Sequence, residues 1–355
     1  MSSNNFINNA WYVAGWDREF TTTPRARTLL NQPVVLYRTE DGKPVALEDR
    51  CCHRHFPLSL GKTIGETIQC GYHGLRFNPA GTCIEIPGQD MIPKNAQVRS
   101  YPVVEKFGWV WIWMGDPAKA DLSLIPNWWW CEHKDWAFIK PDLLYINCNY
   151  ELVTDNLLDV THLAYVHLTS IGTSAITDFP INTSRDGDKV RMTRWVVDRP
   201  APPMYQKFGQ YPGNADRCQM VEFQPPAFCV NFAQVADTGS GAPEGKSGTR
   251  RIDIMALSAP TPETDKTTHY FFGFVRNFGV ADDELHQMIE KNFVNVFKED
   301  VAVLNAQQQR MTQFPNAPEI DIKVDGPPKL ARLVVSRLKA AERGELPKPM
   351  VTAAE

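Results

Sequence analysis

The stretch Cys51-Cys-His-Arg-His55 and the later stretch Cys70-Gly-Tyr-His-Gly74 carry the spacing of metal ligands. The first holds a Cys-x-His pair and the second a Cys-x2-His pair, with sixteen residues between His53 and Cys70. Thiolates and imidazoles this close together along a chain are typical of loops that hold a metal. The two stretches therefore predict a pair of loops around one metal centre.

We interpret this centre as a [2Fe–2S] cluster with the ligands Cys51, His53, Cys70 and His73. Two thiolates on one iron and two imidazoles on the other make one end of the cluster less negative, which raises its reduction potential above that of an all-cysteine cluster. A structural zinc site is the alternative, but zinc modules pair Cys-x2–4-Cys with His-x3–5-His. The cluster predicts a protein that transfers electrons.

A second choice of ligands exists, because Cys52-x2-His55 overlaps the first pair. We assign Cys51 and His53, since a Cys-x-His loop followed by a Cys-x2-His loop is the typical order for such a cluster. Cys52 and His55 then become its neighbours. A cluster domain needs only about a hundred residues, whereas this chain of 355 residues is long enough for roughly two domains with substantial cores.

A second group of candidate ligands lies between Glu151 and His167. If this segment is a helix, Asp155, Asp159 and His162 share one face, and the helix must end or bend for His167 to reach the same metal. The other face is apolar, so the segment should be buried, and buried carboxylates and imidazoles need a compensating cation. Two histidines and one carboxylate form the facial triad of non-haem Fe(II) oxygenases.

The carboxylate of this triad is predicted to be Asp300. It lies in an amphipathic segment that predicts a long helix from about Asp282 to Met311. Asp155 and Glu299 are the alternatives. Each aspartate taken alone is more simply a solvated or ion-paired helix residue, so the paired histidines carry the interpretation.

Composition predicts a soluble, cytoplasmic enzyme. The net charge is −4, and basic residues are scattered, which argues against nucleic acid as a partner. The longest apolar stretch, 109–114, is too short to span a membrane, and the N-terminus Met-Ser-Ser-Asn-Asn has no signal-peptide pattern. Two of the eight cysteines are assigned to the cluster, and a reducing compartment is expected. The expected core or free thiols are Cys83, Cys131, Cys148, Cys218 and Cys229.

Strand patterns divide the chain into two predicted domains, 1–117 and 118–355. In the first, strands are expected at 34–38, 45–47, 103–104 and 109–113. In the second, strands are expected near 190–197, 228–235, 251–257 and 268–274, with an exposed loop at 239–245 and a fraying Pro-rich tail at 347–349. The pattern predicts an α+β protein, with an antiparallel β domain followed by a curved sheet that wraps a long helix.

Together these motifs resemble the oxygenase component of the Rieske non-haem iron oxygenases, and in particular the enzymes that act on vanillate, dicamba and toluenesulfonate. The supporting motifs are Asn9-Ala-Trp-Tyr-Val-Ala14, Ile86-Pro-Gly-Gln89, Trp111-Ile-Trp-Met-Gly-Asp-Pro117, Asp155-Asn-Leu-Leu-Asp159, His269-Tyr-Phe-Phe-Gly273, Arg276-Asn-Phe278, Glu299-Asp300 and Gln307-Gln-Gln309. The chain departs from the common family pattern at Cys52, where proline is usual, and at His55, where a small residue is usual.

The resemblance implies a Rieske domain followed by a helix-grip (START-like) catalytic domain. It implies that Cys51, His53, Cys70 and His73 bind the cluster, and that His162, His167 and Asp300 bind mononuclear Fe(II). It further implies that Asp159 bridges a cluster histidine of one subunit and an iron histidine of its neighbour in a homotrimer, with Asp155 in a supporting position. NADH would supply electrons through a separate flavin or iron–sulfur reductase.

The implied substrates are dioxygen and a small aromatic acid, which is hydroxylated or O-demethylated. Asn231 and Ser258 are candidate pocket residues, and the sequence assigns no arginine to the acid group. A ring cis-dihydroxylating dioxygenase is the alternative enzyme. A Rieske electron-transfer protein without oxygenase activity is the alternative from another class, and it leaves His162 and His167 without a purpose.

Overall fold

The structure is a computed structural model that describes residues 5–246 and 251–345. Residues 1–4 and the predicted frayed tail at 347–349 lie outside the described residues. The chain forms two compact units. The first comprises the described residues up to Ile125 together with Thr261–Asp265, and the second comprises the described residues of Pro126–Pro260 and those from Lys266 onward. The sequence predicts a single boundary after residue 117, without the short return of the chain to the first unit at Thr261–Asp265.

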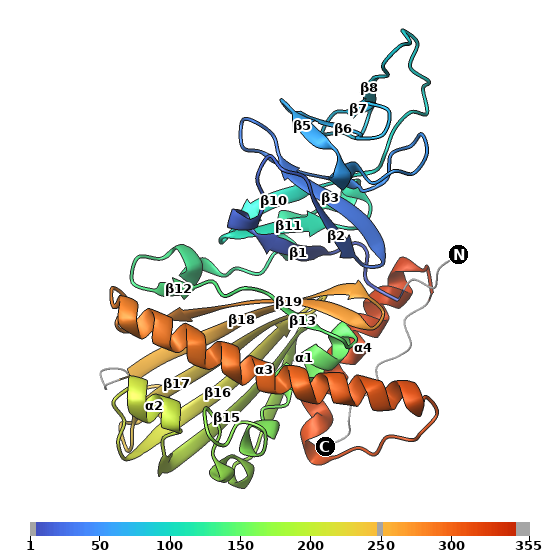
Figure 1. Cartoon of the computed structure of the whole chain (residues 1–355). Helices are drawn as coiled ribbons and strands as arrows, with labels where there is room; N and C mark the ends of the chain where they lie inside the picture. Colours follow the sequence, from blue (N-terminus) through green and yellow to red (C-terminus); the bar gives the residue numbers. More distant parts are fainter. Residues whose placement is uncertain (1–4, 247–250, 346–355) are drawn as a thin grey trace. The chain divides into compact units, whose positions relative to one another are not determined.

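Three antiparallel sheets build the first unit (Figure 1). Their orders are β1-β11-β10, β2-β3-β4-β9 and β5-β6-β7-β8. The strands are β1 Trp11–Trp16, β2 Arg25–Leu29, β3 Gln32–Arg38, β4 Pro44–Glu48, β5 Lys62–Ile64, β6 Thr67–Gln69, β7 Arg76–Phe77, β8 Cys83–Glu85, β9 Ser100–Tyr101, β10 Val103–Lys106 and β11 Trp109–Trp113. The predicted strands at 34–38, 45–47, 103–104 and 109–113 are confirmed. A core beneath the two cysteine loops includes Leu58, Ile68 and Phe77.

One large sheet, mostly antiparallel, organises the second unit. Its order is β12-β19-β18-β17-β16-β15-β14, and β13 pairs with β19 beside β12. The strands are β12 Ala137–Ile139, β13 Leu144–Ile146, β14 Asn182–Asp186, β15 Lys189–Pro200, β16 Asn214–Gln224, β17 Phe228–Asp237, β18 Arg251–Thr264 and β19 Thr267–Arg276. The four strands predicted in this half of the chain are confirmed, whereas β12, β13, β14 and β16 were not predicted.

The long helix α3, Asp283–Gln313, lies across this sheet (Figure 1). Its N-cap is Asp282, whose side chain accepts from the N–H of Leu285, and aromatic residues pack its inner face on β19. The ring centroids of Phe293 and Phe274 are 4.6 Å apart, and those of Phe297 and Phe272 are 4.9 Å apart. The prediction of a long helix wrapped by a curved sheet, and of the α+β class, is confirmed. The other α-helices are α1 Tyr150–Leu158, α2 Pro203–Phe208 and α4 Gly326–Glu342.

Helix α1 ends before His162 and His167, as it must if both histidines are to reach one metal. Asn149 caps its N-terminus, and the chain leaves the helix at Asp159. The carboxylate of Asp159 accepts a hydrogen bond from the N–H of Thr161 at 2.8 Å, which forms an Asx-type turn that redirects the backbone. His162 then begins a short 3-10 turn, His162–Ala164. Asp155, Asp159 and His162 therefore do not share one continuous helix face. Among the helices in the described ranges, none is long and apolar enough to cross a membrane.

Candidate metal centres and their pocket

Each of the two predicted cluster cysteines begins a tight loop, and both loops are closed in the same way. In the first loop, Cys51 N–H donates to Phe56 O at 2.8 Å, and His55 N–H donates to Cys51 O at 3.0 Å. In the second loop, Cys70 N–H donates to Leu75 O at 2.8 Å, and Gly74 N–H donates to Cys70 O at 3.1 Å. The first loop follows β4 and the second follows β6. The matching closures point both cysteine side chains toward one shared core.

The four predicted cluster ligands come together at the tips of these loops. Cys51 and Cys70 are buried, whereas His53 and His73 are exposed, and the two imidazole centroids lie 4.5 Å apart. Burial, together with the thiol of Cys70, raises the pKa of Cys51 to about 12. Two such thiolates are stable side by side only with a cationic centre between them. This donor set, with buried sulfur and exposed nitrogen, fits a [2Fe–2S] cluster.

His55 occupies a position at which the matching loop has glycine. Its φ is 58°, and that of Gly74 is 78°. Left-handed backbone strongly disfavours β-branched residues. We expect His55→Val to lower the free energy of unfolding by about 1–2 kcal/mol relative to His55→Gly, because only glycine adopts this conformation freely. Thermal denaturation of the cluster-loaded variants, followed through the visible cluster spectrum, measures the difference.

The matched control is the same pair of substitutions at Arg54, which is also exposed and has no positive φ. There, valine and glycine should differ by less than about 0.5 kcal/mol, the range of ordinary surface substitutions. Equal stabilities of the two His55 variants would show that this backbone position is not strained in solution.

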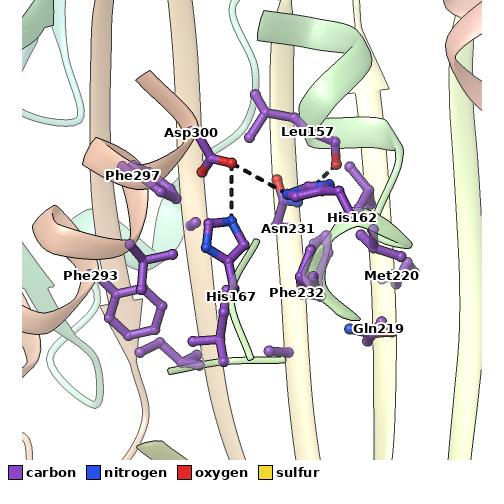
Figure 2. Close-up of a pocket in the computed structure, with 18 of the residues that line it drawn as sticks. Leu157, His162, His167, Gln219, Met220, Asn231, Phe232, Phe293, Phe297 and Asp300 are labelled. Carbon is purple, nitrogen blue, oxygen red and sulfur yellow. Dashed lines mark hydrogen bonds and ion pairs between the residues drawn. The ribbon is translucent and has the colours of Figure 1, made fainter. Parts of the chain in front are cut away.

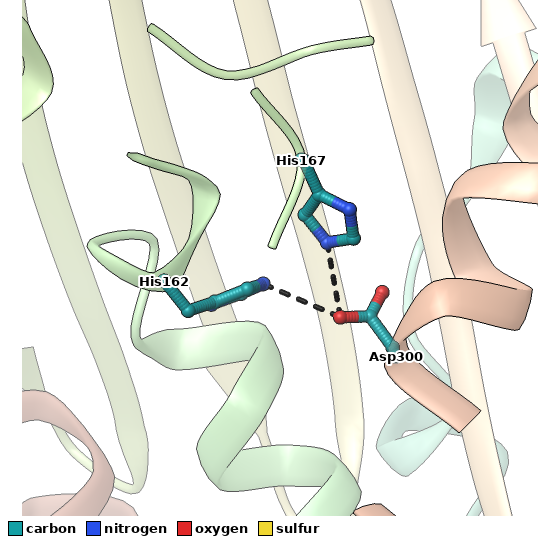
Figure 3. Close-up of side chains that lie close together, drawn as sticks. All are labelled: His162, His167 and Asp300. Atoms are coloured by element: carbon teal, nitrogen blue, oxygen red, sulfur yellow. Dashed lines mark hydrogen bonds and ion pairs between the residues drawn. The ribbon is translucent and has the colours of Figure 1, made fainter. Parts of the chain in front are cut away.

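The second candidate centre joins residues that lie far apart in the sequence. His162 and His167 follow α1, and Asp300 projects from the middle of α3 (Figure 3). The Nε2 atoms of the two histidines lie 3.4 Å and 3.0 Å from Oδ1 of Asp300. One ligand atom from each residue falls within 4.8 Å of the others. The side chains thus converge on one point with two nitrogen donors and one carboxylate oxygen.

The outer nitrogen of each histidine is held by another group. His162 Nδ1 contacts the backbone carbonyl of Asp159, and His167 Nδ1 lies 2.6 Å from Oε2 of Glu299. An acceptor at Nδ1 places the proton there and leaves the Nε2 lone pair for a metal. Although burial opposes it, the adjacent imidazoles of His162 and His167 lower the pKa of Asp300 to about 2. The carboxylate is therefore ionised, and the set fits a facial Fe(II) triad.

Glu299, an alternative ligand in the sequence analysis, instead contacts the far side of His167. We expect Glu299→Gln to weaken Fe(II) binding roughly 10–100-fold, because the amide no longer provides a charged acceptor for the Nδ1 proton. Equilibrium dialysis of the protein against a graded Fe(II) chelator measures the affinity. Glu290→Gln, on the same helix, is the control and should retain the wild-type affinity. An unchanged affinity in Glu299→Gln would remove Glu299 from the site.

Asp155 lies away from the triad. Its carboxylate accepts from Nε of Arg332 at 2.8 Å, and this ion pair ties α1 to α4. Asp159 presents its backbone carbonyl, not its carboxylate, to His162 within the chain. The carboxylates of Asp155 and Asp159 both line a cleft of about 570 Å³ that also reaches His162. Asp159 is thus placed between the triad and an opening on the surface of the second unit.

A largely apolar pocket adjoins the triad between α3 and the sheet (Figure 2). Asn231 lines it and donates to the carbonyl of Leu157 at 3.1 Å. Ser258 was the other predicted pocket residue, but its Oγ is buried against Tyr270 Oη at 3.0 Å, and it is not among the residues that line the pocket. Arg217 and Gln219 of β16 also line the pocket, and the sequence analysis did not single them out.

Comparison with known proteins identifies both halves of the chain. Residues 10–102 match the Rieske [2Fe-2S] domain, and residues 146–341 match the vanillate O-demethylase oxygenase C-terminal domain. The iron-sulfur subunit of a toluene-4-sulfonate monooxygenase system from Comamonas testosteroni is 41% identical over 343 residues, covering 96% of this chain and 99% of the relative.

Two further relatives extend the likeness to enzymes named for demethylation. A vanillate O-demethylase oxygenase subunit from a Pseudomonas strain is 36% identical over 347 residues, covering 95% of this chain and 96% of the relative. Dicamba monooxygenase, in its crystal structure with 3,6-dichlorosalicylic acid, superimposes with a TM-score of 0.90 at 30% identity, covering 96% of this chain and 99% of that one.

Proposed function

The chain belongs to the Rieske non-haem iron monooxygenase family, and on that basis we propose that it is the terminal oxygenase of a multicomponent system that hydroxylates or O-demethylates a small aromatic acid. The observation that carries this proposal is the triad of half-buried His162 with buried His167 and Asp300, beside a largely apolar pocket. An electron carrier has no use for such a pocket, which provides a place for an aromatic ring next to three converging metal donors.

The family's cofactors are a Rieske [2Fe–2S] cluster and a mononuclear iron. We propose that residues 1–117 hold the cluster and residues 118–355 the iron, with the ligands Cys51, His53, Cys70 and His73 for the cluster and His162, His167 and Asp300 for the iron. When bound, the cluster supplies single electrons and the iron supplies dioxygen activation. An O-demethylation would convert an aryl methyl ether, dioxygen, two electrons and two protons into a phenol, formaldehyde and water.

The protein's own residues prepare this chemistry. Asp159 and Glu299 orient the two imidazoles through their Nδ1 atoms, while the triad carboxylate stays ionised. Phe293 and Phe297 of α3 close one side of the pocket and exclude water from the reacting carbon. The side chains thereby set the position of the substrate relative to the metal donors.

We propose two kinds of protein partner, a reductase and further copies of this chain. The homologous oxygenase components work with a separate reductase, and we propose an NADH-dependent reductase with flavin and iron–sulfur centres here. We also propose a homotrimer, in which the exposed His53 and His73 of one subunit approach the cleft at Asp159 of the next. Tyr72, which is 56% exposed beside His73, supplies apolar surface for that contact. None of the eight cysteines, all of which lie within the described residues, forms a disulfide, which fits the cytoplasm as the proposed location.

The proposal is tested by metal analysis and by products. Anaerobically purified protein should contain about three iron and about two acid-labile sulfide per chain, with a Rieske-type resonance after reduction. With NADH, a reductase and 4-methoxybenzoate, it should consume dioxygen and release formaldehyde. A cis-diol with both oxygen atoms would instead identify a ring dioxygenase. About two iron after iron loading, without oxygen uptake, would identify an electron carrier.

A further inference from the structure

We infer that Arg217 binds the acid group of the substrate at the end of the pocket opposite the metal donors. The inference rests on the proposed function and deepens it, because it defines the substrate as an aromatic carboxylate or sulfonate whose reacting group lies across the ring from the acid. Arg217 is a side chain of β16 and lines the same pocket as His162, His167 and Asp300.

Arg217 is a buried charge with unused donors. It is 5% exposed, and its Nη1 donates to the carbonyl of Ile171 at 2.9 Å. Its guanidinium lies 5.1 Å from the centroid of the Tyr205 ring. Nε and Nη2 have no hydrogen-bond partner within the described ranges, and no carboxylate there forms an ion pair with Arg217. A buried cation without a counter-ion is costly, so its retention in a pocket indicates a ligand that supplies the charge.

The free edge of the guanidinium suits an acid group. Nε and Nη2 form two parallel donors, the arrangement that binds two oxygens of one carboxylate or sulfonate. Because arginine remains protonated even when burial lowers its pKa, as it does for Arg217, the side chain stays a cation. Gln219, two residues along β16, is 4% exposed and has a buried side-chain oxygen without a partner in the described structure. It offers a further polar contact on the same strand face.

Strand register places Arg217 far from the metal donors. Along β16, Val221 pairs with Asn231 and Arg217 pairs with Val235, so all four side chains lie on one sheet face. At about 3.4 Å per residue, the Cα atoms of Val221 and Arg217 are roughly 14 Å apart. Figure 2 shows Asn231 beside His162 at the metal end, and Gln219 well removed from Asp300. The span leaves room for one substituted benzene ring between the two ends.

Apolar side chains line the interval between these ends. Ile254 of β18 pairs with Ala233 of β17, and Ala256 of β18 pairs with Asn231. Phe297 of α3 also lines this pocket. They can hold a ring but cannot neutralise a charge. A neutral analogue would therefore leave the guanidinium unpaired, so the site should discriminate against esters and amides.

A second buried arginine does not have this role. Arg194 of β15 is 2% exposed, but its Nη2 donates to Oγ1 of Thr161 at 3.0 Å, and it interacts electrostatically with Asp159. It is not among the pocket-lining residues. The carboxylate of Asp159 supplies a negative charge near Arg194, whereas no carboxylate in the described part of the chain does so for Arg217. The ligand-binding assignment therefore applies to Arg217 alone of this pair.

The test compares acid and neutral probes on the metal-loaded oxygenase under anaerobic conditions. Isothermal titration calorimetry is carried out with 4-methoxybenzoate, 4-toluenesulfonate and neutral 4-methoxybenzamide. We expect Arg217→Met to lose about 100-fold in affinity for the acids, and to change by less than about threefold for the amide, because only the acids form charge-assisted hydrogen bonds. A stronger loss for one acid identifies the preferred class, carboxylate or sulfonate. Arg217→Lys should recover part of the loss.

Two controls separate recognition from structure. Arg191→Met removes an exposed arginine of β15 that is paired with Glu222, and it should leave all three affinities unchanged. The melting temperature of Arg217→Met should equal or exceed that of the wild type, because an unpaired buried charge has been removed. Equal losses for acids and amide, or a wild type that binds neither acid, would overturn the inference.

Oxygen uptake separates this inference from the proposed function. If the wild type binds the acids through Arg217 but consumes no dioxygen with NADH and reductase, the acid site stands and the oxygenase proposal fails. If the wild type releases formaldehyde from 4-methoxybenzoate while Arg217→Met binds that acid normally, the oxygenase proposal stands and the role of Arg217 fails.

Discussion

Replacing His162 with alanine should abolish turnover, lower the iron content from about three to about two per chain and leave the visible spectrum of the cluster intact. His162 provides one of three converging donors, and its Nε2 lies 3.4 Å from Oδ1 of Asp300. The proposed cluster ligands belong to separate loops after β4 and β6. We expect turnover to fall at least about 1,000-fold, because two remaining donors cannot retain the metal against a chelating buffer.

Iron and acid-labile sulfide analysis, with the resonance spectrum of the reduced cluster, measures this outcome. His133→Ala is the matched control, since this histidine is exposed, and its ring lies beside Asp135, at 3.9 Å, and Trp129, with centroids 5.1 Å apart. It should keep all metal and full activity. Circular dichroism of His162→Ala distinguishes metal loss from unfolding. A folded variant that retains its third iron and turns over would remove His162 from the ligand set.

Replacing Asp159 with asparagine should leave both metal sites filled and slow electron transfer between them. Asparagine keeps the side-chain oxygen that accepts from Thr161 N–H, and the backbone carbonyl at His162 is unchanged, so the local turn survives. What disappears is a negative charge that lines the cleft and lies near Arg194. We expect turnover to fall at least about 100-fold, the upper range for loss of a charged group that supports metal ligands.

The rate at which the reduced cluster is reoxidised by substrate and dioxygen, in a single turnover, measures the electron-transfer step directly. Asp186→Asn is the control, because Asp186 is an exposed residue of β14. Full metal content with a slow cluster reoxidation would support the bridging role. Wild-type turnover by a fully metallated Asp159→Asn would contradict it, and iron loss would show that the charge holds the metal site instead.

His162→Ala and Asp159→Asn should impair different steps of the proposed electron transfer from the cluster to the iron. His162→Ala removes the acceptor of electrons, whereas Asp159→Asn interrupts their delivery to an acceptor that is still present. A substrate-binding variant at Arg217 should impair neither the metal content nor the reduction of the cluster by the reductase. Each measurement therefore reports on one component of the protein.

Most of the regular structure follows from local patterns. The run of buried tryptophans in β11 and the apolar alternation of β15 and β17 predict strands, and the amphipathic segment after Asp282 predicts α3. Strand β16 escaped prediction for a physical reason. Its inward face carries Arg217 and Gln219 between apolar residues. Because these polar side chains are buried, the sequence of β16 does not show the alternation of apolar and polar residues that predicts a strand.

Helical geometry explains why the sequence did not decide between Glu299 and Asp300 as the carboxylate that joins the two histidines. Glu299 and Asp300 are adjacent on α3, and both carboxylates contact the ring of His167, one at Nδ1 and one at Nε2. Periodicity identifies the helix, but it does not place the helix against the loop that carries the histidines. That placement depends on the packing of α3 over the sheet, through contacts more than a hundred residues apart in sequence.

The sequence by itself determined the two kinds of metal centre, because Cys-x-His, Cys-x2-His and the paired histidines are short spacings whose ligand chemistry is local. Only the tertiary structure decided that Asp300 converges with His162 and His167, that Glu299 contacts the far side of His167, and that Arg217 lines the pocket without a counter-ion among the described residues. These are relations between strands and helices distant in the chain. Strand register and burial create them, and neither is encoded at any single position.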